Sequence, residues 1–112
     1  MKQVANKSNK KVAIIQGIGK KVPLYDIASQ NGLNMEDFMD ELDMIVDSGT
    51  RLNIDYYIED NVDEYSQDDI LDYFAESETD NIEVAFKELQ EDDINREEIR
   101  LMRIKFMSEK AN

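Results

Sequence analysis

Hydrophobic residues recur at helical spacing near the start of the chain. Val12, Ile15 and Ile18 follow one another at steps of three residues. This spacing predicts a helix over about residues 9–20, because residues three or four apart share one face of a helix. Two glycines near the end of this segment disfavour its continuation, so we expect the helix to end near Lys20.

A pair of helices joined by a glycine is predicted over about residues 23–48. Ile27 and Ala28 belong to the apolar face of the first helix, and Gly32 suits the left-handed conformation that ends a helix. The second helix, over residues 34–48, is the most amphipathic segment of the chain. Its apolar positions are Met35, Phe38, Met39, Leu42, Ile45 and Val46.

These two helices have the spacing of a helix-turn-helix motif. Ala28 is small enough to let two helices approach closely, and Gly32, four residues later, permits a tight turn between them. Phe38, Leu42 and Ile45 fall where the second helix must pack back onto the first. The sequence therefore predicts a helix-turn-helix unit in this part of the chain.

After this motif the pattern changes from helical spacing to strict alternation. Over about residues 51–58, apolar or aromatic residues occupy every second position from Leu52 to Ile58. Alternation predicts a half-buried β-strand, and a short hairpin that turns near Asn53 is the alternative. A strand after the second helix is typical of the winged form of the motif.

Three further helices are predicted, over about residues 66–77, 80–90 and 95–109. The last has apolar residues on two faces, which is typical of a helix packed between neighbours. Each helix begins with a polar cap and an acid three residues later, namely Ser66 with Asp69, Asp80 with Glu83, and Asn95 with Glu98.

The predicted fold class is therefore mainly α. It has a helix-turn-helix or winged-helix-like N-terminal half with one short β-strand or hairpin, followed by three helices. We expect a basic lead-in or linker over residues 1–10 and a single helical domain over residues 11–112, because 112 residues is a usual size for one domain.

Charge is divided unevenly along this chain. The first 25 residues carry six lysines and no acid, whereas all 26 acids lie from Asp26 onward, against seven lysines and arginines. The net charge of −13 favours solubility and repels phosphate backbones at long range. The negative charge thus opposes DNA binding, which is the usual function of a helix-turn-helix motif.

The sequence contains neither cysteine nor histidine. It therefore lacks disulfides, the usual zinc ligands and the usual acid–base group at neutral pH, and we expect a cytoplasmic protein. No apolar run approaches the roughly 20 residues of a membrane helix, so we expect no membrane contact.

We assign no catalytic, cofactor-binding or metal-binding residue to this chain. The acidic run at residues 91–93 lacks the glycine and glutamate of a calcium loop. Residues 17–20 lack the spacing of a phosphate-binding loop.

The second helix of the motif exposes carboxylates where a DNA-reading helix would place its base-contacting side chains. A helix with this face would be repelled by phosphates, so we do not expect it to read a DNA groove. The same face is a candidate surface for protein docking. Its acids are Glu36, Asp37, Asp40, Glu41, Asp43 and Asp47.

Basic residues provide two sets of candidate phosphate contacts. The last helix carries Arg100 and Arg103 on one side, and salt bridges to the many acids are the alternative that we favour for them. For the lysines, the alternative, which we also favour, is a solvated tail or a partner for the acidic body. The lysines in question are Lys7, Lys10, Lys11, Lys20 and Lys21.

Four segments of the chain resemble one family. They are VPLYDIASQNGL at residues 22–33, SGTRLNIDYY at 48–57, EIRLMRIKFM at 98–107 and the opening MKQVANKS at 1–8. In this order and spacing they resemble the C-terminal helix-turn-helix domain of RecQ-type DNA helicases from Bacteroides-like bacteria. The resemblance covers nearly the whole chain.

The resemblance implies a non-catalytic accessory domain of an ATP-dependent helicase that acts in DNA repair and recombination. The nucleotide-binding and zinc-binding residues of such a parent would lie upstream, and none corresponds to a residue here. The implied partners are other domains of the parent helicase, a basic repair protein, or nucleic acid in a weak or indirect contact. The alternative function is an acidic protein–protein interaction module with no DNA binding of its own.

Overall fold

The computed structural model describes residues 2–110, with side chains described from residue 10 onward except at residue 91. This part of the chain forms seven α-helices and one 3-10 turn, and it contains no β-strand. The elements are α1 (Lys2–Gly19), α2 (Leu24–Gln30), α3 (Met35–Asp47), α4 (Asp55–Asn61), α5 (Glu64–Glu76), α6 (Ile82–Leu89), η1 (Gln90–Asp92) and α7 (Arg96–Lys110).

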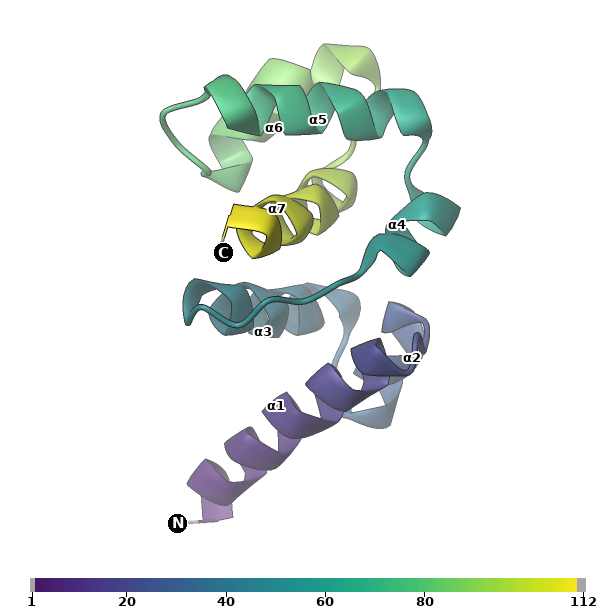
Figure 1. Cartoon of the computed structure of the whole chain (residues 1–112), viewed down its shortest axis with the longest axis vertical. Helices are drawn as coiled ribbons and strands as arrows, with labels where there is room; N and C mark the ends of the chain where they lie inside the picture. Colours follow the sequence, from purple (N-terminus) through teal and green to yellow (C-terminus); the bar gives the residue numbers. More distant parts are fainter. Residues whose placement is uncertain (1, 111–112) are drawn as a thin grey trace.

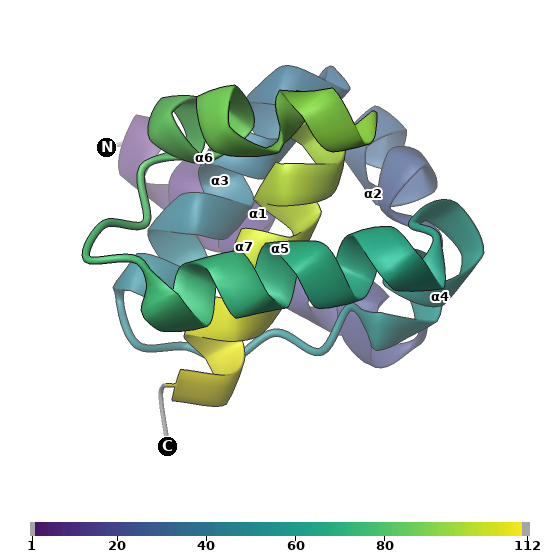
Figure 2. The ribbon, with the colours of Figure 1, turned by 90° about the horizontal axis from the view of Figure 1, so that it is seen from above.

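Helix α7 lies at the centre of the C-terminal half (Figure 2), where it contacts α3, α4, α5 and α6. Ile99 and Met102 on one side and Leu101 and Ile104 on the other are all buried. The prediction that this helix is packed between neighbours is therefore confirmed. Phe106, one turn further on, stacks its ring on the ring of Phe74 of α5, with the centroids 5.8 Å apart.

Helices α1, α2 and α3 form the other end of the molecule (Figure 1) and share one continuous core with α7. Ile14 and Ile18 of α1 are buried together with Ile27 and Ala28 of α2 and Phe38 of α3. Burial of such side chains contributes roughly 1.5–3 kcal/mol each. The helix-turn-helix unit therefore shares its core with the helices that follow it.

The turn between α2 and α3 has the predicted geometry. Gly32 has φ +70°, and the following Leu33 donates its N–H to the carbonyl of Ala28 at 2.9 Å. The side chain of Asn34 accepts a hydrogen bond from the N–H of Asp37 at 2.7 Å, which caps α3. The predicted helix-turn-helix motif is confirmed.

Helix caps in the second half differ in part from the predicted ones. Asn95 and Glu98 form the predicted reciprocal capping box, at 2.8 and 2.9 Å. Helix α5 is capped by Asp63 instead of Ser66, and α6 by Asn81 instead of Asp80. The hydroxyl of Ser66 and the N–H of Tyr65 donate to Asp63 and lower the pKa of its carboxyl group.

The predicted β-strand or hairpin over residues 51–58 is wrong. Residues 51–54 are irregular, with Leu52 and Ile54 buried and Arg51 exposed, and the described residues offer them no partner strand. From Asp55 the chain is helical, so its backbone groups bond within α4 instead of across a sheet. The alternation was ambiguous because Ile54 and Ile58, four residues apart, also share one face of a helix.

Helix α1 begins at Lys2 instead of near residue 9, so residues 2–8 continue the helix. Four of these seven residues are lysine, glutamine or alanine, which are good helix formers, and the stretch contains no proline or glycine. The end of α1 at Gly19 is close to the predicted position. The role of residues 1–10 as a lead-in or linker stays a prediction.

Helices α1 and α2 meet closely at Gly17. A Cβ atom on Gly17 would lie 2.9 Å from both Cγ1 and Cδ1 of Ile27, which is buried. A Cβ atom on Gly19, two residues later, would meet nothing within 4 Å. The two glycines of the same helix therefore differ in the space around them.

We predict that Gly17→Ala lowers the free energy of unfolding by about 1–2 kcal/mol, because overpacking at Ile27 outweighs the gain in helix propensity. The matched control, Gly19→Ala, should raise it by up to about 1 kcal/mol. Urea unfolding followed by circular dichroism measures both. An unchanged or more stable Gly17→Ala variant would contradict the close approach of α1 and α2.

Candidate functional site

Three acids of α3 point toward α7, where two arginines bind them. Arg100 places its Nη2 atom 2.6 Å from Asp40 and 2.9 Å from Asp43. Arg103 binds the other oxygen of Asp43 at 3.2 Å and Asp47 at 3.5 Å. We call these five residues the α3–α7 clamp.

The clamp also reaches the loop before α6. Arg103 donates from Nη2 to the carboxylate of Asp80 at 2.9 Å and from Nε to its carbonyl oxygen at 3.2 Å. The side chains of Arg100 and Arg103 are only 16% and 11% exposed. Salt screens these pairs less than it screens exposed ones, so the clamp fixes α3, α7 and this loop relative to one another.

Opposing effects set the pKa of Arg100. Burial by itself would lower this pKa, but the hydrogen bonds and charges of Asp40 and Asp43 outweigh burial and raise it above its ordinary value. Arg100 therefore stays charged at every physiological pH.

Only part of the candidate docking face on α3 stays available for a partner. Asp40, Asp43 and Asp47 are used by the clamp. On the neighbouring side of α3 Asp37 is exposed, Glu41 is half-exposed and Met44 is 57% exposed. The sixth acid, Glu36, is exposed and lines a shallow hollow against α6 and α7.

The remaining arginine of α7 is also engaged. Arg96 binds Glu83 of α6 with two hydrogen bonds of 2.7 Å, and its guanidinium group lies 4.6 Å from the centre of the Phe86 ring. The basic side of α7 thus meets acids and an aromatic ring of its own chain. The structure agrees here with the salt-bridge interpretation of these arginines.

The lysines near α1 have different surroundings. Lys11, Lys20 and Lys21 are exposed and Lys10 is half-buried, and none forms an ion pair with another described residue. The side chain of Lys7 lies outside the described part of the chain. The cations of α1 and of the turn after it therefore have no competing carboxylate partner among the described residues.

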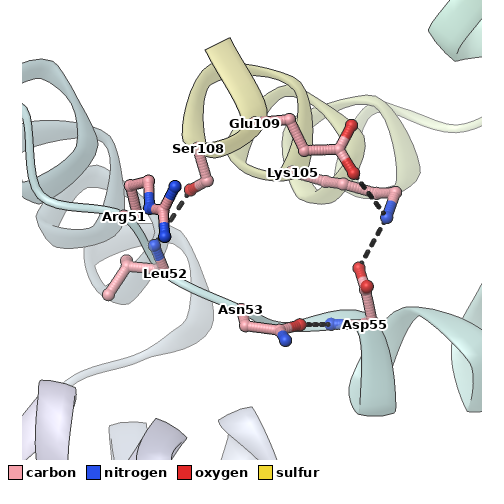
Figure 3. Close-up of a pocket in the computed structure, with 7 residues that line it drawn as sticks. All are labelled: Arg51, Leu52, Asn53, Asp55, Lys105, Ser108 and Glu109. Atoms are coloured by element: carbon pink, nitrogen blue, oxygen red, sulfur yellow. Dashed lines mark hydrogen bonds and ion pairs between the residues drawn. The ribbon is translucent and has the colours of Figure 1, made fainter. Parts of the chain in front are cut away.

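Sequence reasoning missed a hollow beside the irregular segment 51–54 (Figure 3). On the α7 side, Lys105 binds Asp55 at 2.7 Å and Glu109 at 3.1 Å, and the hydroxyl of Ser108 accepts a hydrogen bond from the N–H of Leu52 at 3.0 Å. Burial alone would lower the pKa of Lys105, but its bonds to the two carboxylates raise it. The alternation that placed Leu52 inside was the only sequence signal for this region.

A second hollow lies on the other side of the same segment, between it and α1. Its apolar lining includes Ile15, Ile18, Leu52 and Tyr56. Among the charged residues that line it, Lys21 comes from the turn after α1. Residues 51–54 therefore separate this hollow from the one beside Lys105.

The described residues include no group of three or more acids placed to hold a metal ion. None of the helices that the structure describes is long and apolar enough to cross a membrane.

Helices α1 to α3, with the tight turn at Gly32, define a helix-turn-helix domain. Residues 8–58 match the family model described as "RecQ-1-like, helix-turn-helix domain". This segment of the chain is therefore a helix-turn-helix domain of the RecQ-1-like type, as the resemblance predicted. The match ends at Ile58, so α5, α6 and α7 lie outside it. A comparison with curated proteins found no match.

The clamp makes a prediction about stability. Asp43→Asn should lower the free energy of unfolding by about 1–2 kcal/mol, because the carboxylate that serves both arginines is lost from a site with little solvent. Glu41→Gln, on the same helix but without an ion pair to a described residue, is the matched control and should change stability by less than about 0.5 kcal/mol. Urea titrations of the two variants make the comparison. Equal effects would show that the clamp does not stabilise the fold.

Proposed function

We propose that this chain is a non-catalytic accessory domain of a RecQ-type DNA helicase that makes an auxiliary contact with the DNA backbone through its lysines. One observation carries the proposal: the acids of α3 are held against α7 by Arg100 and Arg103, whereas the lysines of α1 stay unpaired among the described residues. The family match supports the helicase context. In this function α3 supports the fold and does not enter the major groove.

The distribution of charge supports a contact by one end of the domain. Helix α1 lies at one end of the long axis, which measures 44 Å, and α5 lies at the other end (Figure 1). That distance exceeds the Debye length of about 8 Å at physiological salt, so acids on α5 repel DNA at the α1 end only weakly. The exposed acids of α5 are Glu64, Asp68, Asp69, Asp72 and Glu76.

Such a contact has little sequence specificity, because lysine side chains bind phosphates without reading bases. The net charge of −13 keeps the affinity of the separate domain low. Within a longer helicase this weakness matters less, because a tether can give an effective concentration of the order of millimolar.

A second candidate function is docking on a basic protein surface, either a domain of the parent helicase or a repair protein. The observation that favours it is the free face of α3, where Met44 is 57% exposed and lies beside Asp37 and Glu41. An exposed apolar side chain between carboxylates suits a basic partner with an apolar contact at its centre.

DNA titrations at low and moderate salt separate the two candidates. We predict measurable binding at low salt that weakens steeply as salt rises, because each phosphate contact adds about 0.7–0.9 to the logarithmic salt slope. Lys10→Gln, Lys11→Gln and Lys20→Gln together should lower this slope by about two. Fluorescence anisotropy with labelled single-stranded and duplex DNA measures the effect.

The control variant for this titration is Lys87→Gln with Lys110→Gln, which removes exposed lysines from α6 and α7. It should leave the salt slope unchanged. If neither single-stranded nor duplex DNA binds at low salt, the proposed contact is contradicted and docking is favoured. Binding that the lysine variant leaves intact would show that α1 is not its source.

A further inference from the structure

We infer that Asn31–Gly32 is a site of spontaneous deamidation, and that the folded turn between α2 and α3 protects it. Deamidation converts the side-chain amide to a carboxylate, with water as the only co-reactant. The reaction occurs when this turn opens, and its products cannot restore the turn. The modification does not depend on whether the domain contacts DNA, so its failure would leave the proposed function untouched.

The sequence places the reactive pair of residues at one position. Deamidation begins when the backbone nitrogen of the next residue attacks the Cγ atom of an asparagine, and glycine hinders this attack least because it has no side chain. Asn31 precedes glycine, whereas each of the other asparagines up to Asn95 precedes a residue with a long or branched side chain. In an unfolded chain Asn31 is therefore the most reactive of these asparagines.

The reaction needs neither a cofactor nor an oxidant. The Gly32 nitrogen forms a bond to Cγ of Asn31 and loses its proton, while the Cγ–Nδ2 bond breaks and Nδ2 leaves as ammonia. The five-membered imide that results then adds water at one of its two carbonyl groups. One product is aspartate at position 31. The other is isoaspartate, in which the main chain runs through the former side-chain carbon.

The folded turn keeps the reacting atoms apart. Asn31 has φ −102° and ψ 10°, so the Gly32 nitrogen nearly eclipses the backbone nitrogen of Asn31 and is turned away from the side chain. The N–H of Gly32 donates to the carbonyl of Ser29 at 3.1 Å. The leaving nitrogen, Nδ2 of Asn31, donates to the carbonyl of Ile27 at 2.8 Å. Attack therefore requires these two hydrogen bonds to break and ψ to rotate.

Solvent reaches this turn, so the hydrogen bonds and the backbone angles protect it more than burial does. Gly32 is exposed and Asn31 is half-buried. The turn lies in the end of the molecule that contains α1, α2 and α3 (Figure 1). Because a short segment can open at a lower free energy than the whole chain, the rate of deamidation should follow the population of the open turn.

Both products lack what the turn needs. Aspartate has no side-chain N–H to donate to Ile27, and it places a carboxylate at the negative end of the α2 dipole. Isoaspartate adds one carbon to the backbone directly before Gly32, whose φ is +70°. This extra carbon shifts Leu33, whose N–H donates to the carbonyl of Ala28 at 2.9 Å. Deamidation is therefore a one-way change at the turn of the helix-turn-helix unit.

Mass spectrometry of the full chain, aged at neutral pH, tests the site. Peptide mapping locates the mass increase of deamidation, and an isoaspartate methyltransferase assay identifies the second product. Asn31 should react at least about tenfold faster in urea than in the folded chain, because the turn is then open. Asn31→Gln should remove this fast reaction, because glutamine cannot form the five-membered imide.

Two results in urea would overturn the inference. Equal rates at Asn31 in the folded and the unfolded chain would show that the turn does not protect it. Equal rates at Asn31 and at Asn81, which precedes isoleucine, would show that the pair with glycine is not a preferred site.

A pair of glycine variants tests protection in the folded chain. Ile27 accepts the hydrogen bond from Asn31 and also lies against Gly17, so overpacking in Gly17→Ala should open the turn more often. We expect Asn31 to deamidate about fivefold faster in Gly17→Ala and no faster in Gly19→Ala, the matched control. A Gly17→Ala chain that is less stable but deamidates at the parent rate would overturn the protective role of these contacts.

Asn31→Asp imitates the first product and tests the consequence. Its urea midpoint should lie below that of the parent chain and also below that of Asn31→Ala, because the carboxylate opposes the helix dipole in addition to removing the donor. An Asn31→Asp chain as stable as the parent would overturn the conclusion that deamidation disables the turn.

Discussion

The carboxylate of Asp43 lies between two arginines of α7, and the arrangement of the whole chain depends on this contact. It binds Arg100 with one oxygen and Arg103 with the other, at 2.9 and 3.2 Å. Through it the second helix of the helix-turn-helix unit is joined to the helix around which α4, α5 and α6 pack. Removal of one partner would leave buried charge uncompensated, so the two halves of the chain are expected to unfold together.

The clamp gives three acidic residues of α3 a structural role that the sequence did not predict. The sequence predicts that they all face solvent, on the side opposite the apolar stripe. In the structure Asp40, Asp43 and Asp47 form a second packing surface, which needs α7 to complete it. Because α3 has one apolar and one carboxylate surface, it can pack between the core and a neighbouring helix that carries arginines. In this respect α3 differs from the usual DNA-reading helix.

Much of the fold could be predicted from local pattern. The turn at Gly32, the cap at Asn34 and the capping box at Asn95 depend on neighbouring residues, and all three occur as expected. Residues 51–54 are mistaken for a strand because a strand needs a partner, and no local pattern shows whether one exists. The start of α1 is missed because residues 2–8 contain one large apolar residue, Val4, and so show no apolar periodicity of their own.

The candidate site was harder to predict for a similar reason. Arg103 and Asp43 are 60 residues apart, and with 26 acids in the chain each arginine has many equivalent partners in sequence. The hollow beside α1 likewise joins residues of α1 to Leu52 and Tyr56, which only the folded chain brings together. Periodicity defines the face of each helix, but the identity of the opposing face is a tertiary property.

Pairing within the chain explains why so acidic a domain still has a basic surface. Arg96, Arg100, Arg103 and Lys105, four of the seven cations from Asp26 onward, bind acids of neighbouring elements. These pairs remove arginines, the residues best suited to reading bases, from the surface. The lysines of the first 25 residues precede every acid in the sequence and sit on or beside a helix at one end of the molecule. The fold thus uses three of its four arginines in ion pairs within the chain, whereas Lys10, Lys11, Lys20 and Lys21 form no ion pair with another described residue.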